Sequence, residues 1–418
     1  MTEPAVQPPT PPCAPLLLCA IAKNERSAVL EWAAWHLMQG FDQLLVADNG
    51  SSDGTAEFFE AMSQLQLATV LHRGDEAQFQ TRAYAAMLAQ PVAKDALLCF
   101  VDLDEFLVGQ PDQPRAGDVL RTAFAPADVG AVALNWRCFG SAGQRQALEL
   151  PVTQRFVQAC DDHKRGFNRH IKTVVRQSAV EVMHIHHATL GTAWRYVDAD
   201  GQAVRFSSSL TQPAATEGSS PFTLQPTGSL RVHHYVLKSA QEFQDKVARR
   251  QPKGANPLPL DAQKYFSIHD TNDLPCTHAQ AQGAALLQAM QGLQQRLSTE
   301  TDWDKPIRGV VDAITPTHTF GWVADLSPRA QCLRVKVYVN GQLRAITEAQ
   351  RHRPDLQAAG ICAHGKAGFR HDFDPPLNPG DTVQVRVFAN PTELANATQR
   401  VKHPAQARWR KVLRRLTT

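Results

Sequence analysis

The sequence lacks several features that would point to a particular class of protein. It has no Cys-x-x-Cys pair, no apolar run as long as a bilayer crossing, and no basic stripe with interleaved aromatic residues outside its extreme carboxyl end. The last two absences argue against a membrane-spanning helix and against nucleic acid as a partner. The formal net charge of +3 over 418 residues gives no general attraction to polyanions either.

Cysteines are few and widely spaced. Several of the eight lie within apolar, strand-like runs, where small buried thiols are common. This usage favours a reducing cytoplasm, although the even number leaves disulfides open. The cysteines are Cys13, Cys19, Cys99, Cys138, Cys160, Cys276, Cys332 and Cys362.

The amino-terminal residues suggest no targeting segment. Residues 1–15 hold six prolines and no periodic pattern, so we expect a flexible tail. Met1-Thr2-Glu3-Pro4 carries no positive charge of the signal-peptide type, and the apolar run Leu16–Ala22 is too short for a signal or a span. We therefore expect a cytoplasmic protein that reaches any membrane-bound acceptor from the cytosolic side.

The composition and the order of patterns predict a globular α/β protein. Hydrophobic residues make up 43% and charged residues 20%, and the length suits two or three domains. Apolar strand-like runs alternate with helical patterns, which predicts a Rossmann-like, mostly parallel sheet. The predicted strands are Leu16–Ala22, Gln43–Ala47, Ala68–Leu71, Leu97–Val101 and Ala131–Phe139, and the predicted helices are Ala28–Gln39, Thr55–Ser63, Glu76–Leu88, Ser239–Arg250 and Ala279–Leu297.

Three polar clusters follow predicted strands. They are Lys23-Asn24-Glu25, the segment Asp48–Thr55 and Asp102-Leu103-Asp104. Ligands bind at the carboxyl ends of the strands in open α/β sheets, so these clusters predict a binding site. The middle cluster has a simpler explanation as a glycine turn and a helix cap.

The pair Asp102 and Asp104 is the most informative of the three. Two carboxylates one residue apart, after a buried strand, are hard oxygen ligands of the kind that bind Mg²⁺ or Mn²⁺ together with substrate phosphates. An ion held there can neutralise a leaving diphosphate. The pair alone is a weak signal, because acidic residues are common where strands meet loops.

The carboxyl-terminal third has a different pattern. Short alternating runs at Leu333–Val339 and Val383–Phe388, with turn residues Asn340-Gly341 and Asn378-Pro379-Gly380, predict a β-sandwich over residues 306–402. Residues 403–418 form a basic tail that could touch anionic lipid or simply be solvated. The Ser-, Thr-, Pro- and Gly-rich segment 207–228 is a candidate loop or lid.

The chain resembles glycosyltransferases of the GT-A type, families 2 and 92, over about residues 16–275. The resemblance lies in several motifs taken in order, which together are more specific than any one of them. These motifs are Lys23-Asn24-Glu25, Glu31-Trp32 with His36, Asp48–Thr55, Phe100–Phe106, Asn135–Gly140, Arg155-Phe156, and His233-His234-Tyr235 with Lys238-Ser239 and Lys246. Many relatives have paired aspartates after the second strand, where this chain has Asp48-Asn49, which makes a role for Asn49 doubtful.

The resemblance implies a metal-dependent transfer from a nucleotide-diphosphate sugar, in particular a UDP-sugar, to a glycan or lipid-linked saccharide in surface polysaccharide synthesis. It implies that Asp102, Asp104 and His234 hold Mn²⁺ or Mg²⁺, with His233 as the second choice of histidine. It places the remaining donor contacts at Lys23, Asn24, Glu25, Asp48, Asp102 and Lys238, with Lys246 as a further candidate for phosphate.

Related families mostly invert at the anomeric carbon, which needs a general base. Asp162 and Asp270 are the candidates, with Asp161 beside them, because they follow the metal motif in the chain. Each could equally be an ordinary loop carboxylate. Trp136 and Arg137 are expected to line the sugar or acceptor pocket, although Trp136 could belong to the core.

Two other functions stay open at this stage. His184-Ile185-His186-His187 could form a zinc hydrolase site if strand alternation placed His184 and His186 on one face. The chain could also be a non-catalytic glycan-binding protein, in which case Asp102 and Asp104 would be inert. Tight stoichiometric zinc would favour the hydrolase, and weak exchangeable Mn²⁺ or Mg²⁺ the transferase.

Overall fold

A computed structural model describes residues 14–74, 79–92, 95–110, 112–206, 223–250, 262–327 and 330–402. The basic tail at 403–418 lies outside these ranges, as do nearly all of the predicted tail at 1–15 and most of the loop at 207–228. No helix in the described part of the chain is both long and apolar enough to cross a membrane. Each cysteine that the structure describes is a free thiol.

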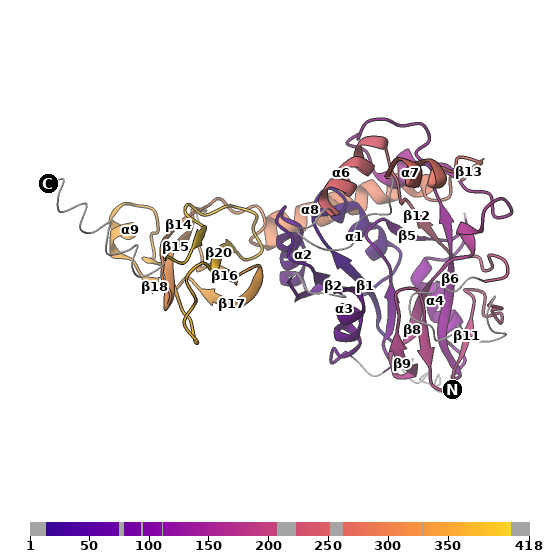
Figure 1. Ribbon diagram of the computed structural model, residues 1–418, viewed down its shortest axis with the longest axis horizontal. Coiled ribbons are helices and arrows are strands. Elements are labelled where there is room, and N and C mark those ends of the chain that lie inside the picture. Colours follow the sequence, from indigo (N-terminus) through magenta and orange to yellow (C-terminus); the bar gives the residue numbers. More distant parts are fainter. Residues whose placement is uncertain are drawn as a thin grey trace, which may run out of the picture. The chain divides into compact units, whose positions relative to one another are not determined.

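Helices and strands alternate through the first part of the chain, as the sequence predicts (Figure 1). The elements up to residue 159 are β1 (Leu16–Ala22), α1 (Val29–Met38), β2 (Gln43–Asp48), α2 (Thr55–Gln64), β3 (Ala68–His72), α3 (Phe79–Leu88), β4 (Leu97–Phe100), β5 (Glu105–Val108), α4 (Ala116–Ala123), β6 (Val129–Cys138), α5 (Val152–Arg155) and β7 (Gln158–Ala159).

The middle of the chain has shorter elements. They are η1 (Gly166–Arg169), β8 (Ile171–Arg176), η2 (Gln177–Ala179), β9 (Val180–Met183), β10 (Ala188–Leu190), β11 (Arg195–Val197), β12 (Arg231–His234), α6 (Ala240–Arg250), α7 (Ala262–His269), β13 (Leu274–Pro275), η3 (Gln280–Gln282) and α8 (Gly283–Glu300).

A nine-stranded sheet forms the centre of the α/β part, with strand order β3-β2-β1-β4-β8-β6-β12-β5 and β11 paired to β6. β1 pairs with β4 in parallel and β2 with β3, whereas β8 runs antiparallel to both of its neighbours. β1 is buried along almost its whole length, which is why its residues form one continuous apolar run. The predicted α/β class is confirmed.

Contacts divide the chain into two compact units. The first comprises residues up to Cys19, Trp35–Gln43 and Tyr84–Leu286, and the second comprises Ala20–Ala34, Leu44–Ala83 and the residues from Leu287 onward. The domain boundaries expected from the sequence, at 16–300 and 306–402, stay a prediction.

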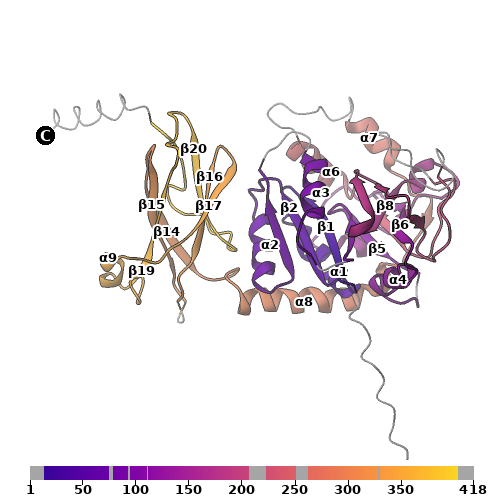
Figure 2. The same ribbon diagram turned by 90° about the horizontal axis from the view of Figure 1, so that it is seen from below.

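The carboxyl-terminal strands form two four-stranded sheets, β14-β15-β19-β18 and β17-β16-β20-β21, which face each other in Figure 2. Valines of both sheets, with Phe369, fill the core between them. The predicted all-β class of this module is therefore confirmed. Its elements are β14 (Ile307–Ile314), β15 (His318–Asp325), β16 (Arg334–Val339), β17 (Gln342–Glu348), β18 (Arg351–His352), α9 (Pro354–Ala358), β19 (Lys366–Asp372), β20 (Thr382–Val387) and β21 (Thr398–Arg400).

The hairpin between β16 and β17 turns at the predicted Asn340-Gly341. Both residues have positive φ, 51° and 80°, the combination that a two-residue type I′ turn requires and that asparagine and glycine tolerate best. The turn sets the pairing of Val339 with Gln342 and so the register of the two strands.

Within the second unit, one buried lysine joins β16 to α2. The ammonium of Lys336 lies 2.9 Å from a carboxylate oxygen of Glu57 and 2.7 Å from one of Glu60. All three side chains are at most 4% exposed, and burial raises the pKa of Glu60 to about 7. Such charges tolerate burial only because they are paired.

Replacing Lys336 with Met should lower the free energy of unfolding by about 3–5 kcal/mol, because two carboxylates would remain buried without their cation. Denaturant unfolding followed by circular dichroism measures the loss. Lys366→Met, at an exposed position of β19, is the matched control and should be near neutral. Equal stability of the two variants would contradict a structural role for the Lys336 pairs.

Candidate functional site

The link between β4 and β5 carries Asp102 and Asp104 and is only four residues long. The amide of Glu105 donates to the carbonyl of Asp102 at 3.1 Å, and the amide of Asp102 donates to the Glu105 carboxylate at 2.9 Å. Leu103 is buried beneath the turn. This tight turn leaves the Asp102 side chain 40% exposed and the Asp104 side chain 14% exposed.

Two lysines from distant parts of the chain pair with these aspartates. Lys172 of β8, fully buried, places its ammonium 2.9 Å from Asp102 Oδ2 and 3.5 Å from Glu105 Oε2. Lys246 of α6 lies 2.5 Å from Asp104 Oδ2 and also donates to the carbonyl of Val236. The predicted phosphate candidate Lys246 therefore contacts the acidic turn and does not lie on a solvated helix face.

The pKa values of the acidic groups in this turn shift in different directions. Burial disfavours the ionised form of both aspartates, but Lys172 outweighs it at Asp102, and Lys246 with His234 outweighs it at Asp104, so the pKa of each is lowered. At Glu105 burial dominates and raises the pKa to about 8. The two aspartates are therefore anionic at neutral pH.

His234, at the end of β12, faces Asp104. Its Nε2 lies 3.7 Å from Asp104 Oδ1, and its ring packs against Trp136 with centroids 4.4 Å apart. Burial lowers the pKa of His234 to about 4, so the imidazole is neutral at pH 7, which is the form that binds metal ions. His233 is the preceding residue on the same strand and faces the other side.

Asp104 and His234 are spaced to share a divalent cation, but Asp102 does not join them in a described group of three side chains whose ligand atoms all lie within 4.8 Å of one another. Two ligands held about 2.1 Å from one ion lie about 3–4 Å apart, which the 3.7 Å between His234 Nε2 and Asp104 Oδ1 satisfies. Carboxylate oxygens are the donors that Mg²⁺ and Mn²⁺ prefer, and an imidazole favours Mn²⁺ of the two. Both lysines contact the Oδ2 atoms, so Oδ1 of Asp104 remains directed at His234.

In the second unit, the loop after β2 is joined to the residues after β1. The Asp48 carboxylate accepts from the amides of Gly50 and Ser51, and Asn24 Oδ1 accepts from the amide of Ser52. Lys23 donates to the carbonyl of Asn49 at 2.5 Å. Asp48 is thus a structural acceptor for its own turn, as the simpler explanation of this segment predicts.

Thr55 completes this connection, since its hydroxyl accepts from the amide of Glu25 at 2.8 Å. Two of the three predicted polar clusters therefore contact each other. Their role in binding a nucleotide stays a prediction.

Asp162 and Asp270 both lie in hydrogen-bonded positions. Asp162 pairs with Arg137 and Arg231 at 3.2 Å each and accepts from Asn168. Asp270 accepts from the amide of Ser141 at 2.6 Å. Their proposed role as general base stays a prediction, as does that of Asp161, whose Oδ1 accepts from the amide of His163.

The histidine group 184–187 does not lie on a strand, so the expected alternation is wrong. These residues form the turn between β9 and β10, because His184 donates its amide to the carbonyl of His187 and closes the hairpin. His184 stacks on His187 with ring centroids 4.4 Å apart, and His186 Nδ1 lies 3.2 Å from the carbonyl of Ile171. The side chains thus serve the hairpin and its packing.

Sequence reasoning missed Lys172 and the burial of Glu105. Lys172 follows Ile171 in a strand that also holds two adjacent valines, and a lysine in such a run is a signal for a buried partner. Lys238, a predicted donor contact, is half-buried and has a positive φ of 59°. Of the predicted pocket residues, Trp136 packs on His170 and His234, and Arg137 pairs with Asp162.

Comparison with known proteins gives one sequence relative. The chain is 21% identical over 243 residues to a glycosyltransferase family 92 protein from Ricinus communis, which covers 56% of this chain and 38% of that protein. The chain therefore spans well under half the length of this curated relative. The likeness supports the predicted resemblance to glycosyltransferases. No family model matches the chain.

Solved structures show only distant likeness. Staphylococcus aureus TarS is 9% identical, with a TM-score of 0.27, and the match covers 93% of this chain and 77% of that one. The 1–349 fragment of TarS is 14% identical, with a TM-score of 0.25, and the match covers 40% of this chain and 48% of the fragment. A 4-diphosphocytidyl-2C-methyl-D-erythritol synthase is 12% identical, with a TM-score of 0.24, covering 40% and 77%. TM-scores this low do not establish a common fold.

Asp162→Asn should lower the free energy of unfolding by about 1–3 kcal/mol at pH 7, since Arg137 and Arg231 would lose their shared anion. Burial opposes the charge of Asp162, but Arg231 lowers its pKa, so the ion pairs stabilise the folded chain above about pH 4 and fail as the pH falls through the lowered pKa. The difference between wild type and variant should therefore shrink on acidification, as measured by unfolding at several pH values. A difference that is constant with pH would contradict this assignment.

Proposed function

We propose that the chain is a metal-dependent glycosyltransferase that moves a sugar from a nucleotide-diphosphate sugar, in particular a UDP-sugar, to a glycan or lipid-linked acceptor. The observation that carries the proposal is the pair of anionic aspartates with a neutral imidazole at the β4–β5 link. The relative in glycosyltransferase family 92 supports the same reaction class.

Asp102, Asp104 and His234 would hold the cation once the Asp102 carboxylate, which is 40% exposed, turns toward the other two. A bound Mn²⁺ or Mg²⁺ supplies positive charge that stabilises the departing diphosphate. Asp102 and Asp104 are already ionised and His234 is already neutral at pH 7, so the chain needs no proton transfer to present these ligands.

The two lysines differ in what they can do. Lys172 is fully buried between Asp102 and Glu105, so we assign it to positioning the acidic turn. Lys246 is 16% exposed, and its long side chain can exchange Asp104 for a phosphate oxygen when the donor arrives. Lys246 would then offset part of the diphosphate charge.

Other parts of the proposal depend on the resemblance alone. These are inversion at the anomeric carbon with its general base, and a role in surface polysaccharide synthesis. A cytoplasmic location and membrane contact through the tail at 403–418 depend on sequence patterns alone. The resemblance alone also supports the contacts that the nucleoside would make with Lys23, Asn24, Glu25 and Asp48. A non-catalytic glycan-binding protein is the competing function, and the first experiment below separates the two.

Asp104→Asn keeps the size of the side chain and removes its charge. With Mn²⁺ and a panel of nucleotide sugars, we expect release of the nucleoside diphosphate to fall by about 100-fold or more, because the cation loses an anionic ligand. Asp273→Asn is the matched control, since its carboxylate pairs with Lys164 in the same unit. Undiminished donor cleavage in Asp104→Asn would overturn the proposal, and a wild type that cleaves none of the donors would favour the binding protein.

Lys246→Met separates binding of the cation from binding of the donor. Mn²⁺ alone should bind about 3-fold or more tightly, because the ammonium no longer competes for Asp104. UDP in the presence of Mn²⁺ should bind about 10-fold or more weakly, because a charged hydrogen bond is lost. Calorimetry measures both, with Lys164→Met as control. If neither affinity changes, Lys246 has only a structural role.

A further inference from the structure

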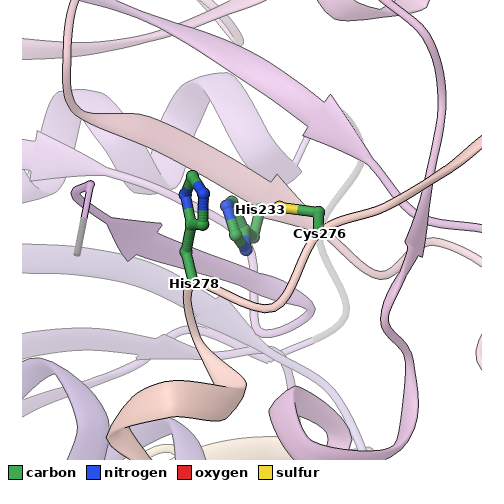
Figure 3. Close-up of side chains that lie close together, drawn as sticks. All are labelled: His233, Cys276 and His278. Carbon is green, nitrogen blue, oxygen red and sulfur yellow. The ribbon is translucent and has the colours of Figure 1, made fainter.

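A second group of side chains of the types that bind metals lies on the side of β12 opposite His234. His233, Cys276 and His278 turn toward one another in Figure 3. Their potential ligand atoms all lie within 4.8 Å of one another. Within the described part of the chain, no other group of three or more histidine, cysteine or carboxylate side chains has this spacing.

Rigid elements hold all three residues. His233 is 2% exposed in β12, between β5 and β6, and its ring packs against Phe139. Cys276 directly follows β13, which pairs with β7, and its amide donates to the carbonyl of Val157 at 2.8 Å. His278 comes two residues later, in the short link between β13 and η3.

This group is distinct from the acidic turn. Successive side chains of a strand point to opposite faces, so His233 faces Cys276 and His278 while His234 faces Asp104. The donor atoms also differ, since two imidazoles and a thiolate are softer ligands than two carboxylates.

We propose that His233, Cys276 and His278 form a zinc site, with a fourth position open to water. Zinc is commonly bound by histidine and cysteine, and three protein ligands with one open position is a known arrangement. Tetrahedral ligands around zinc lie about 3.3–3.6 Å apart, so the side chains need to approach by up to about 1.5 Å. Cys276 and His278 are only partly buried, so their side chains have room to rotate toward His233 while the backbone keeps its place.

Charges around the group are compatible with a thiolate ligand. Zinc binding requires Cys276 to release its thiol proton to solvent. Burial raises the pKa of the Cys276 thiol, and the nearby guanidiniums of Arg137 and Arg231 offset only part of this rise, so the metal itself has to stabilise the thiolate. Both guanidiniums are paired with Asp162, which limits their repulsion of an incoming cation.

Such a zinc ion would connect β12 to the segment after β13. The strand that presents His234 to Asp104 would then be anchored from its opposite face. The site goes beyond the proposed sugar transfer and does not depend on it, because none of its ligands belongs to the acidic turn.

Zinc binding to the full chain tests the proposal. The protein is stripped with chelator and then titrated with Zn²⁺ in competition with a chromophoric chelator, and bound metal is counted by elemental analysis. We expect one Zn²⁺ per chain, with an affinity that falls by about 100-fold or more in Cys276→Ser and in His278→Asn. Co²⁺ in place of zinc should give a thiolate-to-metal charge-transfer band that Cys276→Ser lacks.

Matched controls make the result specific. Cys332→Ser and His352→Asn alter exposed residues of the β-sandwich and should bind zinc as the wild type does. Asp104→Asn should also keep the zinc, which separates this site from the proposed donor site. Circular dichroism of the zinc-free variants checks that they fold. Zinc binding that is absent in wild type, unchanged in both ligand variants or lost in Asp104→Asn would overturn the proposal, as would a preference for Cu²⁺ with no zinc bound.

Discussion

Charge balance at the β4–β5 link constrains much of the first unit. Three carboxylates, those of Asp102, Asp104 and Glu105, stand within four residues of one another. Asp104 and Glu105 are largely buried, which such groups tolerate only with cations nearby. Lys172 and Lys246 supply them, so the positions of β8 and α6 are tied to this turn.

The same balance is compatible with the cation and diphosphate that we propose for this turn. The two aspartates and two lysines cancel in charge, so a cation that arrives together with a diphosphate does not leave a large excess of either sign. Glu105 stays buried with a raised pKa, and it contributes through its hydrogen bond to the backbone of Asp102. The turn is thereby held in shape whether or not a lysine moves.

Local sequence patterns predicted much of the fold. The apolar run Leu16–Ala22 became β1 with the same bounds, and Thr55–Ser63 became α2 with one more residue, because burial and helical periodicity are local signals. The strand alternation on which a zinc site at residues 184–187 depended does not occur, since a short run does not distinguish a strand from the hairpin turn that ends it.

Lysine pairings were harder to predict, because they join residues far apart in the chain. Asp102 and Lys172 are 70 positions apart, and no local feature of the sequence around either residue identifies the other as its partner. Lys336 shows the same limit within the second unit. Its alternation with Val335 and Val337 predicts an outward lysine, and only the tertiary structure shows that Glu57 and Glu60 cover that face.

β12 has a further consequence for how the chain can vary among its relatives. Its two adjacent imidazoles serve opposite sides of one sheet, and neighbouring strands hold it along both edges. Inserting or deleting a single amino acid here would exchange the two rings and disable both environments at once. The length of β12 is therefore as constrained as the identity of its two histidines.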